Sequence, residues 1–152
     1  MKRLTIIVFG FVAACLSLFA QSDLNSSADN IIGNYDVNHH GESTKVTVYR
    51  NTDGTYTAQV YWVENRLDEQ GNVRLDEKNP DESLRDVECD KIIIIKGLVY
   101  NPEKQKWGGT KVYDPTRGFR ASVQCEFVDD GRLRVKGTLL GFSQSIYWAK
   151  IE

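Results

Sequence analysis

Alternation of apolar and polar residues along the C-terminal third of the chain constrains its fold more than any other feature. Apolar side chains occupy every second position from Phe119 to Phe127, and charged or polar side chains fill the positions between them. The same spacing resumes at Leu133 and continues through Val135 to Leu139. A period of two places one face of a strand in a core and the other face in water. These residues therefore predict two half-buried β-strands.

The segment between these strands predicts how they pair. If Phe127 and Leu133 lie opposite one another, residues 129–131 (Asp-Asp-Gly) form a three-residue hairpin loop in which Gly131 takes the left-handed conformation. The same register places Glu126 opposite Arg134 on the outer face, where the two charges attract one another. Loop length and charge pairing agree, so the sequence predicts this hairpin together with its register.

The remainder of the chain also favours strands. Valine, isoleucine, tyrosine and threonine are frequent, turn residues separate the apolar runs, and further strands are expected at 32–38, 44–50, 55–64, 91–99, 106–113 and 144–151. Eight strands with mostly short connections predict an all-β fold, an antiparallel meander that closes into a barrel and so leaves no free edge. A two-sheet sandwich is the alternative.

One connection is much longer than the others. Residues 65–90 hold nine acidic and four basic side chains, a net charge of −5. A connection of this length is expected to carry local structure or function. Asn79 and Pro80, followed by Glu82, are typical of a helix start, so we expect a short helix near 81–86 with Leu84 packed inward.

The first twenty residues have the composition of a secretory signal peptide. Lys2 and Arg3 precede an apolar run from Leu4 to Ala20, and the chain then becomes polar. Cleavage after Ala20 would release a periplasmic or secreted protein with no membrane insertion, whereas a lipoprotein anchored at Cys15 is the alternative. Residues 21–30 are small and polar and predict a flexible leader, and residues 31–152 then form a single β-barrel domain.

Charge and cysteine content limit the possible functions further. The 152-residue chain has a formal net charge of −2, so it lacks the basic character expected of a nucleic-acid-binding protein. Export would permit a disulfide between Cys89 and Cys125, but a free Cys125 packed as a small apolar residue is equally compatible with the strand pattern.

Several motifs resemble one bacterial family. They are Asn79-Pro80-Asp81-x-x-Leu84-Arg85, Gly97-Leu98, Trp107-Gly108-Gly109-x-x-x-Tyr113-Asp114-Pro115-x-x-Gly118, Leu133-x-Val135-x-Gly137 and Trp148-x-Lys150. The chain from about Ile31 to Ile151 resembles the secreted family known as domain of unknown function 2147, and the resemblance implies a lipocalin-like (calycin-like) barrel and export. No catalytic residue is implied, because the activity of that family is unassigned.

Lipocalin-like barrels commonly begin with Gly-x-Trp and carry a late arginine that packs across the tryptophan. Here Gly33-Asn34-Tyr35 and Lys150 occupy those places. Tyrosine and lysine can still form an aromatic–cation pair, although lysine lacks the planar stacking of arginine.

The leading functional hypothesis is that a small apolar or amphipathic molecule binds inside the barrel. Eight strands enclose just enough space for one small ligand, and the strand-borne glycines Gly97, Gly108, Gly109 and Gly137 reduce the filling of that space. The alternation predicts the lining residues, which are Tyr56, Trp62, Phe119, Val123, Phe127, Leu133 and Val135.

Two other classes of function stay open. One is an interaction module of the cell envelope with a filled barrel, for which Arg120, Arg132, Arg134 and Lys136 would form a basic outer stripe. The other is a hydrolase that uses carboxylates among Asp76, Asp81 and Asp114. Asp114 also fits a turn and Asp81 a helix start, and neighbouring His39 and His40 on a strand or turn point to different sides. The sequence therefore predicts no catalytic residue, cofactor or metal site.

Overall fold

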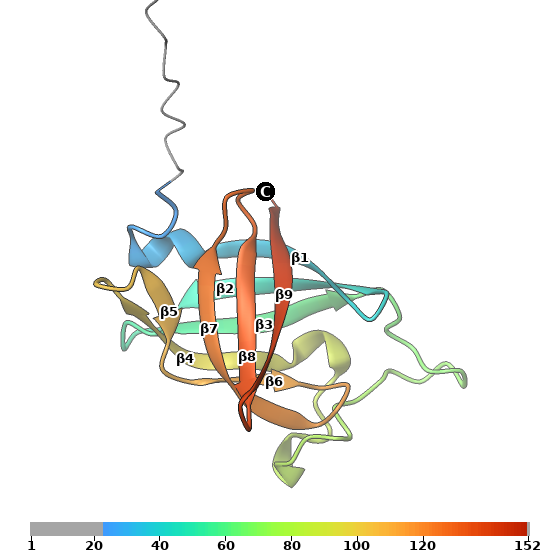
Figure 1. Ribbon diagram of the computed structural model, residues 1–152. Helices are drawn as coiled ribbons and strands as arrows, with labels where there is room; N and C mark the ends of the chain where they lie inside the picture. Colours follow the sequence, from blue (N-terminus) through green and yellow to red (C-terminus); the bar gives the residue numbers. More distant parts are fainter. Residues whose placement is uncertain (1–22, 152) are drawn as a thin grey trace, which may run out of the picture.

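The computed structural model describes residues 23–151, which form one closed antiparallel β-barrel (Figure 1). The predicted signal peptide lies outside the described residues. Nine strands make up the sheet, and their bounds are β1 Gly33–His39, β2 Glu42–Arg50, β3 Tyr56–Val63, β4 Ile93–Asn101, β5 Lys106–Gly108, β6 Lys111–Asp114, β7 Phe119–Phe127, β8 Leu133–Leu139 and β9 Phe142–Ile151.

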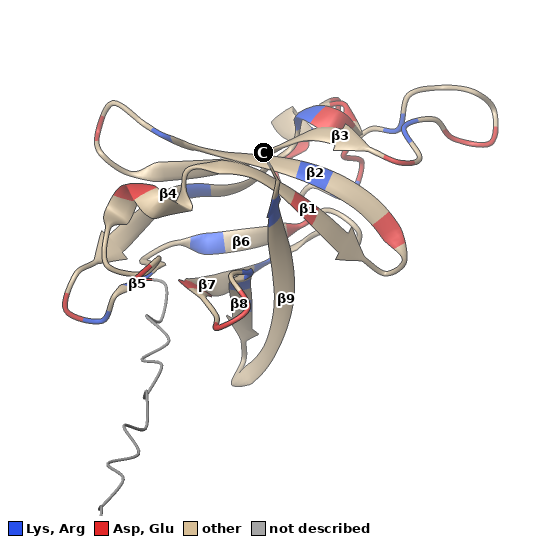
Figure 2. Ribbon diagram, turned by 90° about the horizontal axis from the view of Figure 1, so that it is seen from above, with Lys and Arg blue, Asp and Glu red and all other residues tan. Residues whose placement is uncertain are grey.

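The barrel closes because the strands at both ends of the sheet find partners. Neighbouring strands follow the order β3-β2-β1-β9-β8-β7-β5-β4-β6, and the additional pairings β3–β4 and β7–β6 complete the ring. Figure 2 shows β9 crossing from β8 to β1 and thereby joining the two curved walls. The predicted all-β barrel is confirmed, and the sandwich alternative does not apply.

The predicted hairpin of β7 and β8 has the predicted register. Phe127 lies opposite Leu133, and Glu126 lies opposite Arg134 and forms an ion pair with it. Gly131 adopts a φ of 81°, which is the left-handed conformation that the loop requires.

One expected strand is divided in two. Residues 106–113 were expected to form a single strand, but β5 ends at Gly108 and β6 begins at Lys111. Gly109 has a φ of 79°, so the chain turns there, and β5 pairs with Cys125 while β6 pairs with residues nearer the start of β7. The ninth strand therefore arises from a glycine bend.

The long connection contains only short 3-10 turns, η2 at Glu82–Leu84 and η3 at Cys89–Lys91. The helix expected near 81–86 is reduced to η2, and Leu84 is 39% exposed instead of packed inward. Asp81 supplies the cap by accepting a hydrogen bond from the Ser83 backbone N–H, whereas the Asn79 side chain bonds to Asp76 and to the Asp81 backbone.

The segment from Asn25 to Ile31 packs against one end of the barrel. The expectation there was a flexible leader over 21–30, but residues 28–31 form the 3-10 turn η1 (Ala28–Ile31) and Ile31 is buried. The hydroxyl of Tyr56 donates to Asp29, and the indole N–H of Trp107 donates to the Ala28 carbonyl. These contacts close this end of the barrel.

Lys150 and Tyr35 form part of the same closed end. The Lys150 Nζ lies 6.0 Å from the centre of the Tyr35 ring and donates to the Asn30 carbonyl at 3.0 Å. The aromatic–cation pair expected from the family resemblance is therefore present.

Among residues 23–151, no helix combines the length and the apolar character needed to cross a membrane.

Candidate functional site

The opposite end of the barrel is open and leads into a cavity of about 570 Å³. Antiparallel pairing brings the β1–β2, β6–β7 and β8–β9 connections to this end, together with part of the 65–90 connection (Figure 1). The interior wall is apolar and comes from most of the strands; its principal members are Val37, Val46, Val60, Ile94, Val112, Phe119, Ala121, Val135, Ile146 and Trp148.

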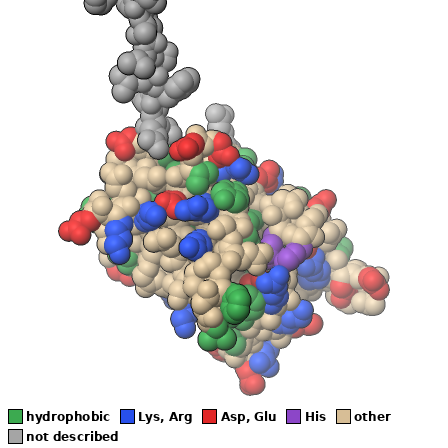
Figure 3. Space-filling view, in the orientation of Figure 1, with side chains coloured by type: hydrophobic (Ala, Val, Ile, Leu, Met, Phe, Trp, Pro, Cys, Tyr) green, Lys and Arg blue, Asp and Glu red, His purple; other side chains and the backbone are tan. Residues whose placement is uncertain are grey.

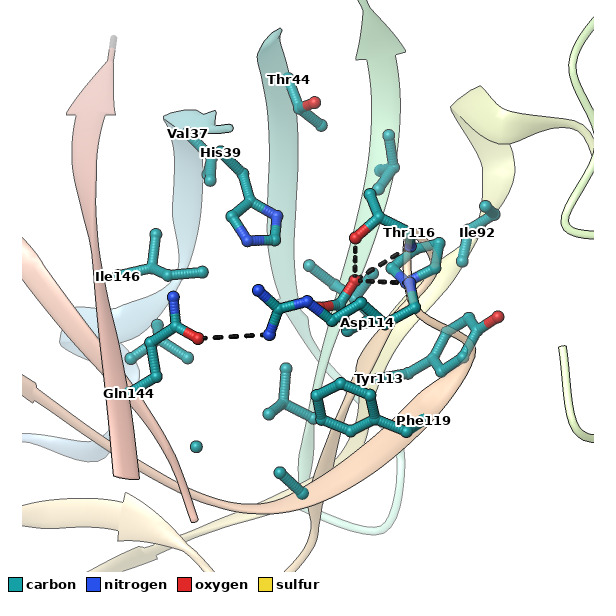
Figure 4. Close-up of a pocket in the computed structure, with 18 of the residues that line it drawn as sticks. Val37, His39, Thr44, Ile92, Tyr113, Asp114, Thr116, Phe119, Gln144 and Ile146 are labelled. Carbon is teal, nitrogen blue, oxygen red and sulfur yellow. Dashed lines mark hydrogen bonds and ion pairs between the residues drawn. The ribbon is translucent and has the colours of Figure 1, made fainter. Parts of the chain in front are cut away.

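Polar side chains of the cavity gather at the strand ends that form the mouth. They are His39, Glu42, Thr44, Arg74, Asp114, Thr116, Arg117, Ser143 and Gln144. Figure 4 shows His39, Asp114, Thr116 and Gln144 around the opening, with Val37, Ile146 and Phe119 beside them. The site thus has an apolar interior and a polar rim.

Arg117 extends across this mouth from the β6–β7 connection. Its Nη1 donates to Oε1 of Gln144 on β9 at 3.4 Å, a contact marked by the dashed line from Gln144 in Figure 4. Its Nη2 lies 3.4 Å from Nε2 of His40 in the β1–β2 turn, and its Nε lies 3.8 Å from Oδ2 of Asp114. One guanidinium therefore connects three separate parts of the rim through long contacts.

The remaining charged groups of the rim have closer partners. Arg74 donates to Glu42 at 2.7 Å, and this ion pair raises the pKa of Arg74. Oδ1 of Asp114 accepts from the backbone N–H and the hydroxyl of Thr116, at 2.9 and 2.6 Å, which fixes the turn before β7.

His39 projects from the end of β1 into the mouth (Figure 4). Burial lowers the pKa of its imidazole, and the neighbouring His40 and Arg117 lower it further, against the opposing effect of Asp114. Its ring lies 4.0 Å from that of His40. In the described part of the chain, no group of three or more histidine, cysteine or acidic side chains is arranged to hold a metal ion.

A buried polar cluster anchors the rim to the long connection. Asp76 is only 3% exposed, and its carboxylate accepts from the Tyr113 hydroxyl and from the Asn79 side chain, both at 2.6 Å. Burial and the Asp76 carboxylate together raise the pKa of Tyr113, so its hydroxyl stays protonated and keeps donating. Gly118 packs against the Lys78 backbone beside this cluster. These contacts fix the position of the loop that carries Arg117.

Of the seven predicted lining residues, Phe119 and Val135 line the cavity. Tyr56 and Phe127 are buried at the closed end, and Val123 and Leu133 are buried in the core, none of them in the cavity wall. The predicted strand parity is right for these four residues, but their side chains fill space below the cavity.

Trp62 was expected to line the cavity, but its side chain lies on the outside of the barrel and is 41% exposed. A β-bulge shifts the register of β2 and β3, so that Lys45 lies opposite Trp62 while the next residue of β2, Val46, lies opposite Val60. One extra residue in β3 reverses the faces beyond it. Val63 therefore points into the cavity, and Trp62 lies under the Lys45 ammonium at 5.2 Å.

Several lining residues were absent from the prediction. Val37, Ile146 and Trp148 lie on strands whose positions were expected, so the same alternation argument applied to the first and last strands would have found them. Arg117 carries no such signal, because its place at the mouth depends on the packing of its loop.

Several residues of the two alternative hypotheses already have structural partners. Asp114 lines the cavity, whereas Asp81 caps η2 outside it, and hydrogen bonds from Ser83 lower the pKa of Asp81. In the proposed basic stripe, Arg134 pairs with Glu126 and Arg132 pairs with Asp130. Figure 3 shows basic and acidic side chains intermixed on this face.

Cys89 and Cys125 are both buried free thiols; Cys89 lines the cavity and Cys125 lies in the core.

Comparison with known proteins gives the family and the fold. The model of the family described as "Uncharacterized protein conserved in bacteria (DUF2147)" matches residues 33–150, so the chain belongs to this family. No curated protein matches the sequence significantly. A similar solved structure is that of protein HP1028 from Helicobacter pylori, described as belonging to the lipocalin family. It shares 20% sequence identity with a TM-score of 0.63, over 80% of this chain and 83% of that one, and so supports the lipocalin-like fold.

Proposed function

We propose that this member of the DUF2147 family binds one small apolar or amphipathic molecule inside its barrel. The observation that carries the proposal is the cavity of about 570 Å³, whose wall is mainly apolar and whose polar groups lie at one end of the barrel. Small-molecule sites commonly have volumes of about 300–1,000 Å³, apolar walls and a few polar groups that fix orientation. Transfer of an apolar chain from water into this space supplies the driving force for binding.

Gly137 provides a way to fill the cavity without disturbing the strand. It lines the cavity from β8, and its φ lies outside the left-handed region, so an L-residue fits its backbone. A Cβ at this position would meet Ala121 and Val112 at 3.4 and 3.5 Å, which is ordinary contact, and a larger side chain would extend into the lumen.

The test is titration with the neutral apolar dye N-phenyl-1-naphthylamine, whose fluorescence increases in apolar surroundings. We expect saturable binding to the native protein and at least about tenfold weaker binding to Gly137→Leu, because the isobutyl group occupies the ligand volume. Ser145→Leu, which adds a leucine at an exposed position of β9, is the matched control and should bind like the parent. Equal binding by the two folded variants would overturn the proposal.

We further propose that residues 1–20 direct export of the protein. Their cationic start and apolar run support this, and an anchor at Cys15 is the alternative. The intact mass of the protein from its native host distinguishes the two outcomes, because simple cleavage gives a chain that begins at Gln21 and lipidation gives one that begins at an acylated Cys15.

A further inference from the structure

The division of the cavity into an apolar interior and a polar rim constrains how a ligand would lie in it. Valine, isoleucine and aromatic side chains surround the depth of the lumen, and the four ionic side chains among its lining residues, Glu42, Arg74, Asp114 and Arg117, all come from the open end. A molecule bound there would place an apolar chain inward and a polar group at the mouth.

Among the charged lining residues, Arg117 has the longest contacts with its polar partners. Arg74 has a carboxylate partner at 2.7 Å, whereas among residues 23–151 Arg117 has an ion pair with Asp114 alone, at 3.8 Å. Asp114 already accepts two shorter hydrogen bonds from Thr116 through its other oxygen. The polar contacts of the two terminal nitrogens of Arg117 within the described part of the chain are with an amide oxygen and an imidazole nitrogen, each at 3.4 Å.

Contacts of this kind are readily exchanged for an anion. Charge-assisted N–H···O bonds are normally about 2.7–2.9 Å long, and the planar guanidinium presents paired donors that match the two oxygens of a carboxylate. Arg132 has a close carboxylate partner in this same protein, since its Nε and Nη2 both donate to one oxygen of Asp130, at 2.9 and 2.7 Å. Arg117 has no such partner within the described chain.

The surroundings of Arg117 favour an amphiphile over a free anion. Its guanidinium carbon lies 6.0 Å from the centre of the Phe119 ring, which lines the cavity directly below the rim. An anionic head bound to Arg117 would therefore place the first carbon atoms of its chain against Phe119, and the rest of the chain would extend toward Val135 and Trp148.

We propose that the ligand is a single-chain amphiphile with a carboxylate head, and that Arg117 binds this head at the mouth. This inference rests on the proposed function and narrows the class of ligand from apolar molecules in general to carboxylates with an apolar tail. Arg117 is a specificity-determining residue in this scheme, and Phe119 contacts the first part of the chain.

The experiment compares dodecanoate with dodecanol as competitors for bound N-phenyl-1-naphthylamine at neutral pH. The two compounds have the same chain length and differ in head charge. We expect dodecanoate to compete about tenfold more strongly with the native protein, as charge-assisted hydrogen bonds would give, and to lose this advantage in Arg117→Gln while dodecanol competes as before. Added salt should weaken competition by dodecanoate more than competition by dodecanol, because salt screens the head-group charge.

Arg132→Gln is the matched control, because it removes the same charge from an exposed ion pair outside the cavity and should leave the preference intact. Equal competition by acid and alcohol with the native protein would overturn the assignment of the head group. If Arg117→Gln weakens competition by both compounds equally, the assignment of the head group is also overturned. Neither result affects the proposal that the cavity binds an apolar molecule. That proposal fails separately if dye binding does not respond to Gly137→Leu.

Discussion

The side-chain amide of Asn25 bonds both backbone polar groups of Phe127. Its Nδ2 donates to the Phe127 carbonyl at 2.9 Å, and its Oδ1 accepts from the Phe127 N–H at 2.7 Å. The amide thus pairs with the end of β7 as a neighbouring strand would. Together with the contacts of η1, it fastens the N-terminal segment over the closed end of the barrel.

Asn25→Ala removes both hydrogen bonds and leaves the Phe127 backbone without partners there. We expect the free energy of unfolding to fall by about 1–2 kcal/mol, measured by urea denaturation. Ser27→Ala is the control, because the Ser27 side chain makes no capping hydrogen bond to η1. Unchanged stability of Asn25→Ala would mean that the pairing of Asn25 with Phe127 contributes nothing to the stability of the closed end.

Gly118 and Gly131 have similar backbone angles but different surroundings. Their φ values are 71° and 81°, so alanine is strained at both positions. A Cβ at Gly118 would also collide with the carbonyl oxygen of Lys78, whereas nothing lies within 4 Å of a Cβ at Gly131. We expect a loss of about 1 kcal/mol for Gly131→Ala and a clearly larger loss, about 2–3 kcal/mol, for Gly118→Ala.

Urea denaturation of the two alanine variants side by side separates backbone strain from steric collision. Similar losses would show that the loop carrying Arg117 shifts easily away from Lys78. The larger loss at Gly118 would show that the long connection holds this loop firmly at the mouth.

Leu140 is an unfavourable residue for the place it occupies. It has a φ of 50° in the two-residue turn between β8 and β9, is 89% exposed, and precedes Gly141 with a φ of 83°. Figure 3 shows apolar side chains gathered toward the lower end of the visible face, and Phe142 beside Leu140 is 83% exposed. Turns of this geometry favour asparagine at the first position.

Leu140→Asn should therefore stabilise the protein by about 0.5–1 kcal/mol in urea denaturation. His40→Asn, in the equivalent turn between β1 and β2 where φ is 54°, serves as a second instance of the same geometry. Loss of stability in Leu140→Asn would indicate that the leucine side chain packs favourably at the rim.

His39 predicts a pH dependence of stability. Because its pKa in the folded protein lies below the ordinary value of 6.5, the unfolded chain binds the proton more readily. Protonation therefore favours unfolding, and the stability present at neutral pH is lost as the pH falls below 6.5 toward the folded-state pKa. His40, Asp114 and Arg117 are the charged or titratable groups that face this imidazole.

Urea midpoints measured from neutral pH into mild acid check this prediction. We expect a smaller decline for His39→Gln than for the native protein, because glutamine cannot take up the proton. If the urea midpoints of the two proteins decline equally with pH, groups other than His39 cause the acid sensitivity.

Strand positions and the β7–β8 register were predictable because they depend on residues close together in the sequence. The alternation from Phe119 onward and the Asp-Asp-Gly loop are local features, and each has one structure that satisfies it. Trp62 was misplaced because a bulge adds one residue between Val60 and Val63, and its register is set by pairing with β2. The misplacement of Leu84 has a similar origin, since the Asp76–Tyr113 contact orders this connection in place of a helix.

The all-β class, the strand boundaries to within a few residues and the inward faces of most strands follow from local sequence, because side-chain alternation and turn chemistry act over a few neighbouring residues. Which end of the barrel is filled and which is hollow depends instead on packing between distant segments. Trp107, Tyr56 and Phe127 meet the N-terminal segment at one end, while Gly137, Ala121 and several valines meet at the other. A cavity depends on the combined volume of side chains from strands far apart in the sequence. Packing of the 65–90 connection likewise placed the guanidinium of Arg117 over that cavity.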